Sequence, residues 1–391
     1  MKRFLTLIFI LLGAVQGWAK QTCDTVFILQ DAGETNALLP VIEKYAQNNE
    51  NFLILTAGQA TDTLSQKINL KNKTLSFDQL GISEKIDKSW KRDEKISEES
   101  LKKITDEIEA KKVVAGVAFE LQGQLLEAYK ARKSQTFAYW DNPSYEGTDP
   151  YFQTAQKVAK TPDLLLVPSK AFKNAYPQAE VVGQPSYELW KQQLSGIQPS
   201  TVTAKLPFSL KSPVIVFLGG TGSEYDEAFK QFLSYAGDLK GYTVLIAPHP
   251  RLGGKVEKKE LEKRTFSHVH LIEESWNISS MEAIAIADHV ICHKSTTGIN
   301  AAVAGRAVIY FIPSNQVYTN LLIEQGGAPV VSSLDELTAS LRTKQSFGKD
   351  PFKILKVPQG SVDLIYDRIH EPIPLNSLND LSDNFRSKSN N

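Results

Sequence analysis

The strongest constraint on the fold is a regular alternation of short apolar runs with helical patterns. Residues 25–29 (TVFIL) are followed by the segment 36–46, whose apolar residues recur at helical spacing, and the next apolar run is 52–55 (FLIL). The same rhythm restarts at 214–218 (VIVFL) and continues to residue 331. Strands that alternate with helices indicate βαβ units and a parallel sheet. The sequence therefore predicts an α/β protein with two Rossmann-like parallel-sheet domains.

A segment rich in proline, serine and threonine separates the two series of strands. It contains Pro199, Pro207 and Pro213, and we interpret it as an interdomain linker. Beyond Gly348 the chain becomes polar and rich in proline, and its last residues are typical of a mobile tail. The predicted organisation is a signal peptide at 1–19, an N-terminal domain at 20–195, a linker at 196–213, a C-terminal domain at 214–348, and an extension with a polar tail at 349–391.

Composition excludes several classes of function. The chain has 391 residues, of which 42% are hydrophobic, enough for two domains with substantial cores. Because 44 basic residues balance 44 acidic ones, the chain lacks the net positive charge that is typical of nucleic-acid-binding proteins. Any anion-binding site must therefore depend on a local group of residues. Two cysteines exclude a disulfide scaffold. The six histidines lack the spacing of metal ligands, so neither a metal nor a cofactor is predicted.

The first residues are typical of a secretory signal. Lys2 and Arg3 precede the apolar run 4–15, and Gly17-Trp18-Ala19 is a small-x-small cleavage site. The apolar run is shorter than the roughly 20 residues that a membrane-spanning helix needs. We therefore expect export to the periplasm or beyond, with an uncleaved anchor as the alternative.

The loop after the first strand carries two acids. It reads QDAGETN, in which Gly33 permits a tight turn and Asp31 and Glu34 supply carboxylates where a helix begins. Ligands of parallel α/β sheets lie at the carboxyl ends of strands, so Asp31 and Glu34 are the first candidates for a general base. Helix capping by Asp31 or Thr35, with Glu34 as a first-turn acid, explains the same residues equally well.

Two loops of the second series are candidates for contacting a phosphate. The loop 219–224 (GGTGSE) offers glycines and hydroxyls before a helix, although it matches neither GxGxxG nor the Walker pattern. The turn 248–251 (PHPR) follows a strand, and its histidine and arginine suit a diphosphate or the protonation of a leaving group. A surface turn fixed by two prolines is the alternative for the second loop. The predicted residues are Gly220, Thr221, Gly222, Ser223 and Arg251 as ligands, and His249 as a catalytic group.

The strand-to-helix turn 294–298 (KSTTG) is the fourth unusual loop. Helix-start N–H groups, hydroxyls and a lysine together suit an anionic group, whereas a cap alone needs only one serine or threonine. We interpret this turn as a phosphate cradle. Its predicted ligands are Lys294, Ser295, Thr296, Thr297 and Gly298.

The order of these parts resembles the nucleotide-binding domain of GT-B-fold proteins, such as bacterial UDP-N-acetylglucosamine 2-epimerases, lipid A disaccharide synthases and CDP-glycerol glycerophosphotransferases. The similar residues are Ala287-Asp288-His289-Val290-Ile291, Ser295 to Gly298, Ala301-Ala302, Gly305 and Val308-Ile309, with Val182-Gly183-Gln184-Pro185 at the end of the first domain. The resemblance spans about 24–341. It implies a GT-B-like pair of domains facing a cleft, with a diphosphate-containing donor bound to the second domain.

The chain also departs from that family pattern. His293-Lys294 stand where an acid is frequent, Asn300-Ala301 where a glutamate is frequent, and Arg306-Ala307 follow Gly305 in place of x-Pro. A non-catalytic relative would show exchanges of this kind.

Three hypotheses for the function follow. The first is a GT-B-like glycosyl- or glycerophosphate-transferase that uses a nucleotide sugar or other diphosphate-activated donor, with a glycan or lipid-linked acceptor entering near Asp31, Glu34 and Asp141-Asn142. Nucleotide sugars belong to the cytoplasm, so the export signal favours a second hypothesis, a non-catalytic binding protein for a phosphorylated sugar or glycan. The third is an epimerase or hydrolase that acts on a similar ligand.

Overall fold

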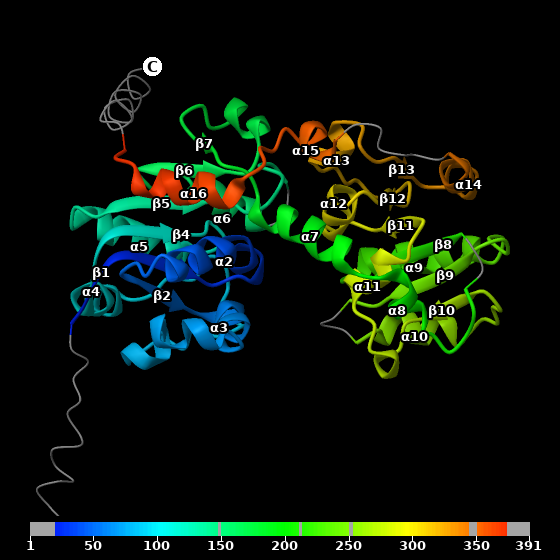
Figure 1. Ribbon diagram of the computed structural model, residues 1–391, viewed down its shortest axis with the longest axis horizontal. Helices are drawn as coiled ribbons and strands as arrows, with labels where there is room; N and C mark the ends of the chain where they lie inside the picture. The colour runs from blue at the N-terminus through cyan, green and yellow to red at the C-terminus, as the bar shows by residue number, and fades with distance from the viewer. Residues whose placement is uncertain (1–19, 148–149, 211–212, 250–252, 344–349, 374–391) are drawn as a thin grey trace, which may run out of the picture. The chain divides into compact units, whose positions relative to one another are not determined.

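The computed structural model describes residues 20–147, 150–210, 213–249, 253–343 and 350–373. They divide into two compact units (Figure 1). Unit 1 comprises Met1–Gly183 and Ser361–Asn391, and unit 2 comprises Gln184–Gly360. Each unit is built on one parallel sheet with interleaved helices, which confirms the predicted fold class. The signal peptide predicted at 1–19 lies outside the described residues.

Unit 1 contains a seven-stranded parallel sheet in the order β3-β2-β1-β4-β5-β6-β7. The chain runs outward from β1 to β3 and then returns to place β4 on the other side of β1. The topological switch point, where ligands of such sheets bind, therefore lies between β1 and β4. The strands are β1 (Gln21–Leu29), β2 (Phe52–Thr56), β3 (Thr74–Ser76), β4 (Ile108–Ala115), β5 (Gln135–Tyr139), β6 (Leu164–Val167) and β7 (Glu180–Val181).

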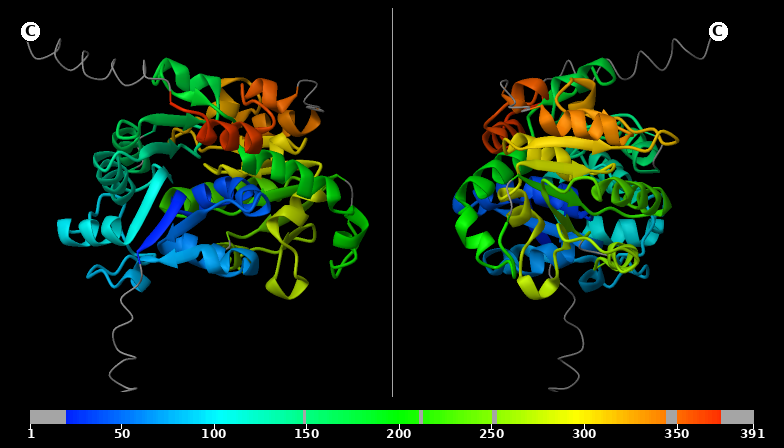
Figure 2. Two further views of the ribbon diagram at one scale, coloured as in Figure 1. Left: turned by 60° about the vertical axis from the view of Figure 1, so that its left-hand side comes forward. Right: turned by 90° about the vertical axis from the view of Figure 1, so that its right-hand side faces the viewer.

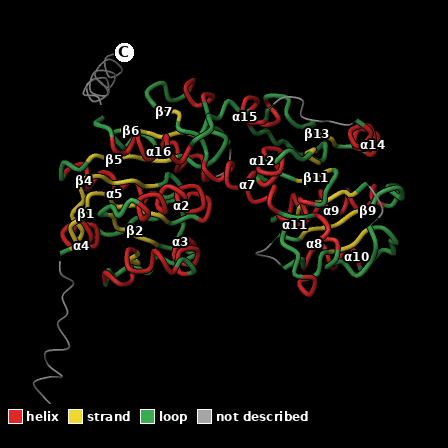
Figure 3. Tube along the Cα trace, viewed as in Figure 1, coloured by secondary structure: helices red, strands yellow, loops and turns green. Residues whose placement is uncertain are grey.

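Helices cover both faces of this sheet, which explains why its strands are apolar on both sides (Figure 3). One face packs against α4 (Glu98–Glu107), α5 (Glu120–Ala131) and α6 (Pro150–Val158). The other face packs against α2 (Ala32–Gln47) and α3 (Gly58–Ser65). Three short 3₁₀ helices complete the connections: η1 (Ile68–Lys73), η2 (Phe77–Leu80) and η3 (Lys170–Asn174).

The last described helix, α16 (Ser361–His370), belongs to unit 1 and lies beside α2 (Figures 1 and 2). Ile365 and Ile369 are fully buried in the core that α2 contributes to. The Tyr366 ring packs edge-on against Tyr45, with 5.1 Å between the ring centroids. The segment predicted as a C-terminal extension therefore divides between the units, since α15 (Pro351–Ile354) belongs to unit 2.

Unit 2 repeats the design with a six-stranded parallel sheet in the order β10-β9-β8-β11-β12-β13. Its switch point lies between β8 and β11. The strands are β8 (Val214–Leu218), β9 (Thr243–Ala247), β10 (Val269–Leu271), β11 (His289–Cys292), β12 (Ala307–Phe311) and β13 (Val330–Val331). The helices are α7 (Pro185–Gly196), α8 (Pro199–Thr203), α9 (Ser223–Ala236), α10 (Lys255–Leu261), η4 (Glu274–Trp276), α11 (Ser280–Ala285), α12 (Thr297–Val303), α13 (Leu321–Glu324) and α14 (Leu334–Arg342).

The boundary between the units differs from the predicted linker at 196–213. The division falls between Gly183 and Gln184, and α7 packs against α12 within unit 2. Pro199, which suggested a linker, is the first residue of α8, where its fixed φ and missing N–H are tolerated, and α8 packs against α11. Within the described ranges, no helix combines the length and apolarity that crossing a membrane requires.

Candidate functional site

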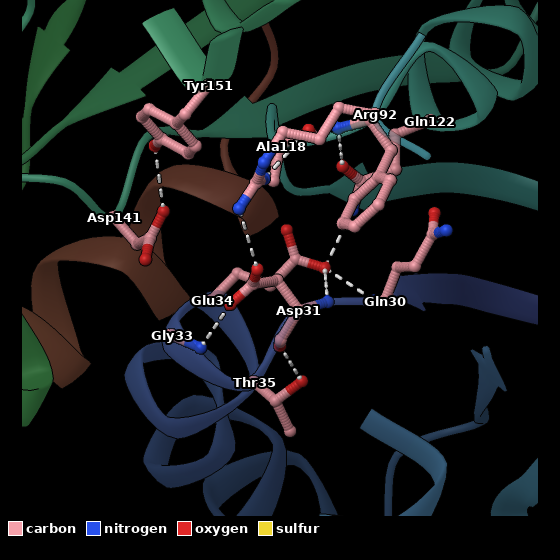
Figure 4. A network of polar contacts seen from close by, with 11 residues as sticks. Gln30, Asp31, Gly33, Glu34, Thr35, Arg92, Ala118, Gln122, Asp141 and Tyr151 are labelled. Atoms are coloured by element: carbon pink, nitrogen blue, oxygen red, sulfur yellow. Dashed lines mark hydrogen bonds and ion pairs between the residues drawn. The ribbon is translucent and has the colours of Figure 1, made fainter. Parts of the chain in front are cut away.

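The switch point of unit 1 gathers side chains from three neighbouring strand ends. Because β1, β4 and β5 are parallel and adjacent, the loops that follow them meet at one edge of the sheet. Asp31 and Glu34 follow β1, Gln122 lies in α5 after β4, and Asp141 follows β5. Figure 4 shows these residues with Arg92 and Tyr151 in one polar network.

Asp31 and Glu34 cap the start of α2, so helix capping, the alternative to a catalytic role, accounts for both acids. Asp31 is the N-cap residue, and its Oδ1 accepts a hydrogen bond of 2.7 Å from Gly33 N–H. Glu34 Oε1 accepts from the backbone N–H groups of Gln30, at 2.5 Å, and Asp31, at 3.0 Å. This reciprocal arrangement is a capping box.

Glu34 is nevertheless an unusual capping residue because its side chain is fully buried. Its Oε1 also accepts from Gln122 Nε2 at 2.7 Å, whereas Oε2 has no hydrogen-bond partner in the described structure. Burial, together with the negative charge of Asp31, raises the pKa of Glu34 to about 8. A buried carboxyl group of this kind holds its proton at neutral pH.

Asp141 lies against Gly33, as Asp31 does. A Cβ at position 33 would lie 2.5 Å from Asp141 Oδ2 and 3.3 Å from Asp31 Oδ1, so a side chain there would displace the Asp141 carboxyl group. Asp141 Oδ1 accepts a hydrogen bond of 3.1 Å from the Tyr151 hydroxyl. Burial, and then the charge of Asp31, raise the pKa of Asp141 to about 7.

Arg92 supplies the positive charge of the network. Its Nη2 lies 3.4 Å from Asp31 Oδ2, and its Nη1 donates to the Ala118 carbonyl oxygen at 3.1 Å. The guanidinium lies over the rings of Phe119 and Tyr151, each 5.1 Å from the ring centroid. The Asp31 side chain keeps 26% of its exposure and that of Arg92 32%, so both are accessible to a ligand.

Next to this network, the side chain of Gln30 is buried with neither amide atom hydrogen-bonded within the described part of the chain. Buried amides are normally paired with protein or with ordered water. Gln30 and Glu34 Oε2 therefore leave three polar atoms unsatisfied at the carboxyl end of β1.

The switch point of unit 2 brings together the loops that the sequence singled out there. Leu218 of β8 pairs with Cys292 of β11, so the glycine-rich loop and the KSTTG turn leave the sheet side by side. Gly219 also approaches the loop after β9, where a Cβ at position 219 would lie 2.5 Å from His249 N. His249 is half-buried, whereas Arg251 lies outside the described residues.

The glycine-rich loop presents an uncapped helix start. Gly222 is the N-cap of α9 and makes no side-chain cap, and Thr221 and Ser223 are exposed beside it. The first turn carries the acids Glu224 and Asp226. Gly220 packs against the Tyr225 ring.

The KSTTG turn is partly engaged within the protein. Ser295 Oγ accepts a hydrogen bond of 3.2 Å from Thr297 N–H, and the Ser295 carbonyl accepts from the Tyr310 hydroxyl at 3.3 Å. Thr296 is exposed, and the buried Gly298 lets α12 approach β12. Lys294 Nζ forms a 2.7 Å ion pair with Glu224 Oε2 of α9, so the predicted phosphate ligand already has an anionic partner.

Among the described residues, no group of three or more histidine, cysteine, aspartate or glutamate side chains has a metal-binding arrangement. Both cysteines are free and buried.

Comparison with solved structures decides the fold. A UDP-GlcNAc 2-epimerase from Neisseria meningitidis, bound to UDP-GlcNAc, superposes with a TM-score of 0.64 at 14% identity, covering 89% of this chain and 100% of that one. MurG of Acinetobacter baumannii gives 0.58 at 15% identity, covering 89% and 99%. The wall teichoic acid polymerase TagF gives a TM-score of 0.51 at 14% identity, covering 90% of this chain and 88% of that one.

The chain has a GT-B-type fold. No protein-family model matches it, and no curated protein matches it by sequence.

Within this GT-B-type fold, the loops that the sequence singled out lie at the switch points of the two sheets, but the sequence did not indicate the whole polar network. Asp31 and Glu34, and the loops around Gly220 and Ser295, lie at the two switch points. Arg92 and Tyr151 were not predicted as site residues, because neither lies directly at a strand end. Asp141 was noted only as a residue near the acceptor, although it directly follows β5 and Trp140.

Proposed function

We propose that this chain is a GT-B-type transferase that takes a diphosphate-activated donor, most simply a nucleotide sugar, at the loops of unit 2. The acceptor hydroxyl would bind at the polar network of unit 1. Support for the donor comes from two features. The fold neighbours include an epimerase bound to UDP-GlcNAc, and the loops after β8 and β11 converge on an uncapped helix start.

The observation that carries the proposal is the carboxyl network around Asp31 and Asp141. A general base works best when its pKa lies near the operating pH, and that of Asp141 is raised to about 7. Asp141 would take the proton of the acceptor hydroxyl as its oxygen attacks the donor carbon and the bond to the diphosphate breaks. Asp31 would keep the pKa of Asp141 raised, and Glu34, which has no exposed surface, would hold the start of α2.

A second candidate is an epimerase or hydrolase acting on the same class of ligand. Two carboxyl groups, the accessible Asp31 and Asp141, lie in one network against Gly33, as a reaction that both removes and returns a proton requires. The alternatives differ in their products. An epimerase changes the sugar and keeps the diphosphate bond, a hydrolase releases nucleoside diphosphate without an acceptor, and a transferase releases it only with one.

The test is incubation of the full chain with UDP-sugars, with and without oligosaccharide acceptors, and product analysis by mass spectrometry and NMR. We expect acceptor-dependent release of UDP that Asp141→Asn lowers by about 100-fold or more while UDP binding is retained. Binding without turnover would replace the transferase with a non-catalytic binding protein. The absence of nucleotide binding would refute the proposal.

Export by the segment 1–19 is proposed as well. Because nucleotide sugars belong to the cytoplasm, an exported transferase would need a lipid-linked diphosphate donor in place of a nucleotide sugar. The basic start, the apolar run and the small-x-small site support export. Amino-terminal sequencing of the protein recovered from the cell envelope should begin at Lys20. Recovery of the intact amino terminus from the cytoplasm would refute export.

A further inference from the structure

The ion pair between Lys294 and Glu224 raises a question about the proposed donor site, because a phosphate ligand would need the same lysine. Arg251 lies outside the described residues, and Lys294 is the lysine that the structure describes in the loops after β8 and β11. Its Nζ lies 2.7 Å from Glu224 Oε2. The hydrogen bond from Lys294 lowers the pKa of Glu224, which keeps this carboxylate ionised at neutral pH.

The backbone at Lys294 is unusual as well. Its φ is +34°, a left-handed conformation that side-chain-bearing residues rarely adopt. Strained residues persist where the surroundings fix them, and they concentrate at functional sites. The Lys294 side chain is only 23% exposed, so it lies against the protein rather than extending freely into solvent.

Two neighbouring side chains connect this ion pair to the next loop of unit 2. Gln316 Nε2 donates to the Glu224 carbonyl oxygen at 2.9 Å, which leaves Gln316 Oε1 as an acceptor facing His293 Nε2 at 2.7 Å. His293 is buried, and burial lowers its pKa, so the neutral ring donates this hydrogen bond. His293, Lys294, Glu224 and Gln316 thus form a closed ring of contacts.

The two members of the ion pair differ in accessibility. The Glu224 side chain is 61% exposed, whereas that of Lys294 is 23% exposed. An ion pair with one partner so exposed contributes little to stability, and solvent screens it. Glu224 can therefore leave Lys294 when a stronger anion arrives, while the lysine stays in place.

We propose that Glu224 is an internal competitor that occupies Lys294 in the ligand-free protein and lowers the affinity of the unit 2 loops for a diphosphate. The inference rests on the proposed function, since it concerns the same donor site. In this role, Glu224 sets the affinity of the unit 2 loops for a diphosphate. A phosphate that reaches Lys294 displaces the Glu224 carboxylate, which then rotates into solvent on the first turn of α9.

The test measures binding of two probes, UDP and inorganic pyrophosphate, to the full chain by calorimetry at low salt. The variants are Glu224→Gln, Lys294→Met, the double variant, and Asp226→Asn as a control that removes the same charge from the same helical turn. Thermal unfolding of each protein without ligand verifies the fold. We expect Glu224→Gln to bind the probes roughly fivefold more tightly than the wild type, as the loss of an exposed ion pair implies. Asp226→Asn should have a smaller effect.

The double variant tests whether Glu224 lowers the affinity for the probes through Lys294. If Glu224 acts through Lys294, Glu224→Gln gives no gain in a Lys294→Met background. Equal gains from Glu224→Gln and Asp226→Asn, or equal gains with and without Lys294, would overturn the inference and leave the proposed function standing. Binding of pyrophosphate but not UDP by Glu224→Gln would support the inference and refute the nucleotide donor. Failure of every protein to bind either probe would overturn both.

Discussion

The carboxyl group of Glu34 rests directly on the backbone of Gly116. A Cβ at position 116 would lie 1.5 Å from Glu34 Oε2 and 2.9 Å from Gln122 Nε2. The first residue after β4 is therefore part of the acid network, although it has no side chain of its own. This contact explains how an acid in the first turn of α2 can be fully buried at a strand end.

Gly116→Ala should consequently destabilise unit 1. The added methyl group displaces Glu34, and overpacking of this kind costs about 1–3 kcal/mol in the free energy of unfolding. The matched control is Gly196→Ala at the end of α7, where nothing lies within 4 Å of the added Cβ. Urea unfolding of both variants tests the contact. A loss no greater than that of the control would show that Glu34 does not occupy this position.

Glu34 should also make stability depend on pH. Its pKa is about 8 in the folded protein against the ordinary glutamate value of 4.5, so the folded state binds the proton more tightly than the unfolded state does. This contribution to stability is complete below about pH 4.5 and is lost as pH rises toward 8, with a slope of at most about 1.4 kcal/mol per pH unit.

Glu34→Gln keeps an acceptor for the capping bonds and removes the titration. We expect its free energy of unfolding to fall less than that of the wild type between pH 5 and pH 8. Glu127→Gln, on the exposed side of α5, is the control and should keep the wild-type slope. A difference between Glu34→Gln and wild type that is the same at both pH values would contradict the assignment.

The placement of α16 predicts a large effect from a residue near the end of the described chain. Ile369 is fully buried in unit 1, so Ile369→Ala should cost about 2–5 kcal/mol. Leu364, on the same helix, is 39% exposed, and Leu364→Ala should cost less than about 1 kcal/mol. Chemical denaturation of the two variants makes the comparison. Equal, small effects would mean that α16 does not pack on α2.

The sequence predicted the two parallel sheets and the loops at their switch points because both follow from local patterns. Strand alternation identifies the sheets, and parallel pairing places all carboxyl strand ends at one edge. Contacts between distant segments have no such signal. Arg92 lies 61 positions from Asp31, in a stretch without helical or strand periodicity, and only the folded chain brings them together.

A similar limit applies to the start of β4. The charged segment 98–111 has a helical pattern throughout, yet β4 begins at Ile108. Ile108 and Ala110 are buried while Glu109 and Lys111 are exposed, a period of two that the preceding helical charges obscured. Pairing with β1 decides the conformation there, since Ile108 lies opposite Gln21.

A buried pair beneath the glycine-rich loop gives the last prediction. The Tyr225 hydroxyl donates a 2.6 Å hydrogen bond to Glu257 Oε1, and Glu257 Oε2 has no partner among the described residues. Glu257 Oε1 also lies 2.8 Å from the Cβ position of Gly219, so this carboxyl group packs directly against the glycine-rich loop. Tyr225→Phe leaves the buried carboxyl group without that donor, which should cost about 1–3 kcal/mol.

The control is Tyr235→Phe on the same helix. The Tyr235 hydroxyl accepts from Gln231 Nε2 at 2.8 Å, but its side chain is only half-buried, so water replaces the lost partner. We expect an effect below about 1 kcal/mol there. Because Glu257 contacts the loop that precedes α9, Tyr225→Phe should weaken UDP binding as well, whereas Tyr235→Phe should not. Calorimetry measures both quantities. A Tyr225→Phe variant as stable as the control would show that the carboxyl group finds another donor, and the loop would then keep its affinity.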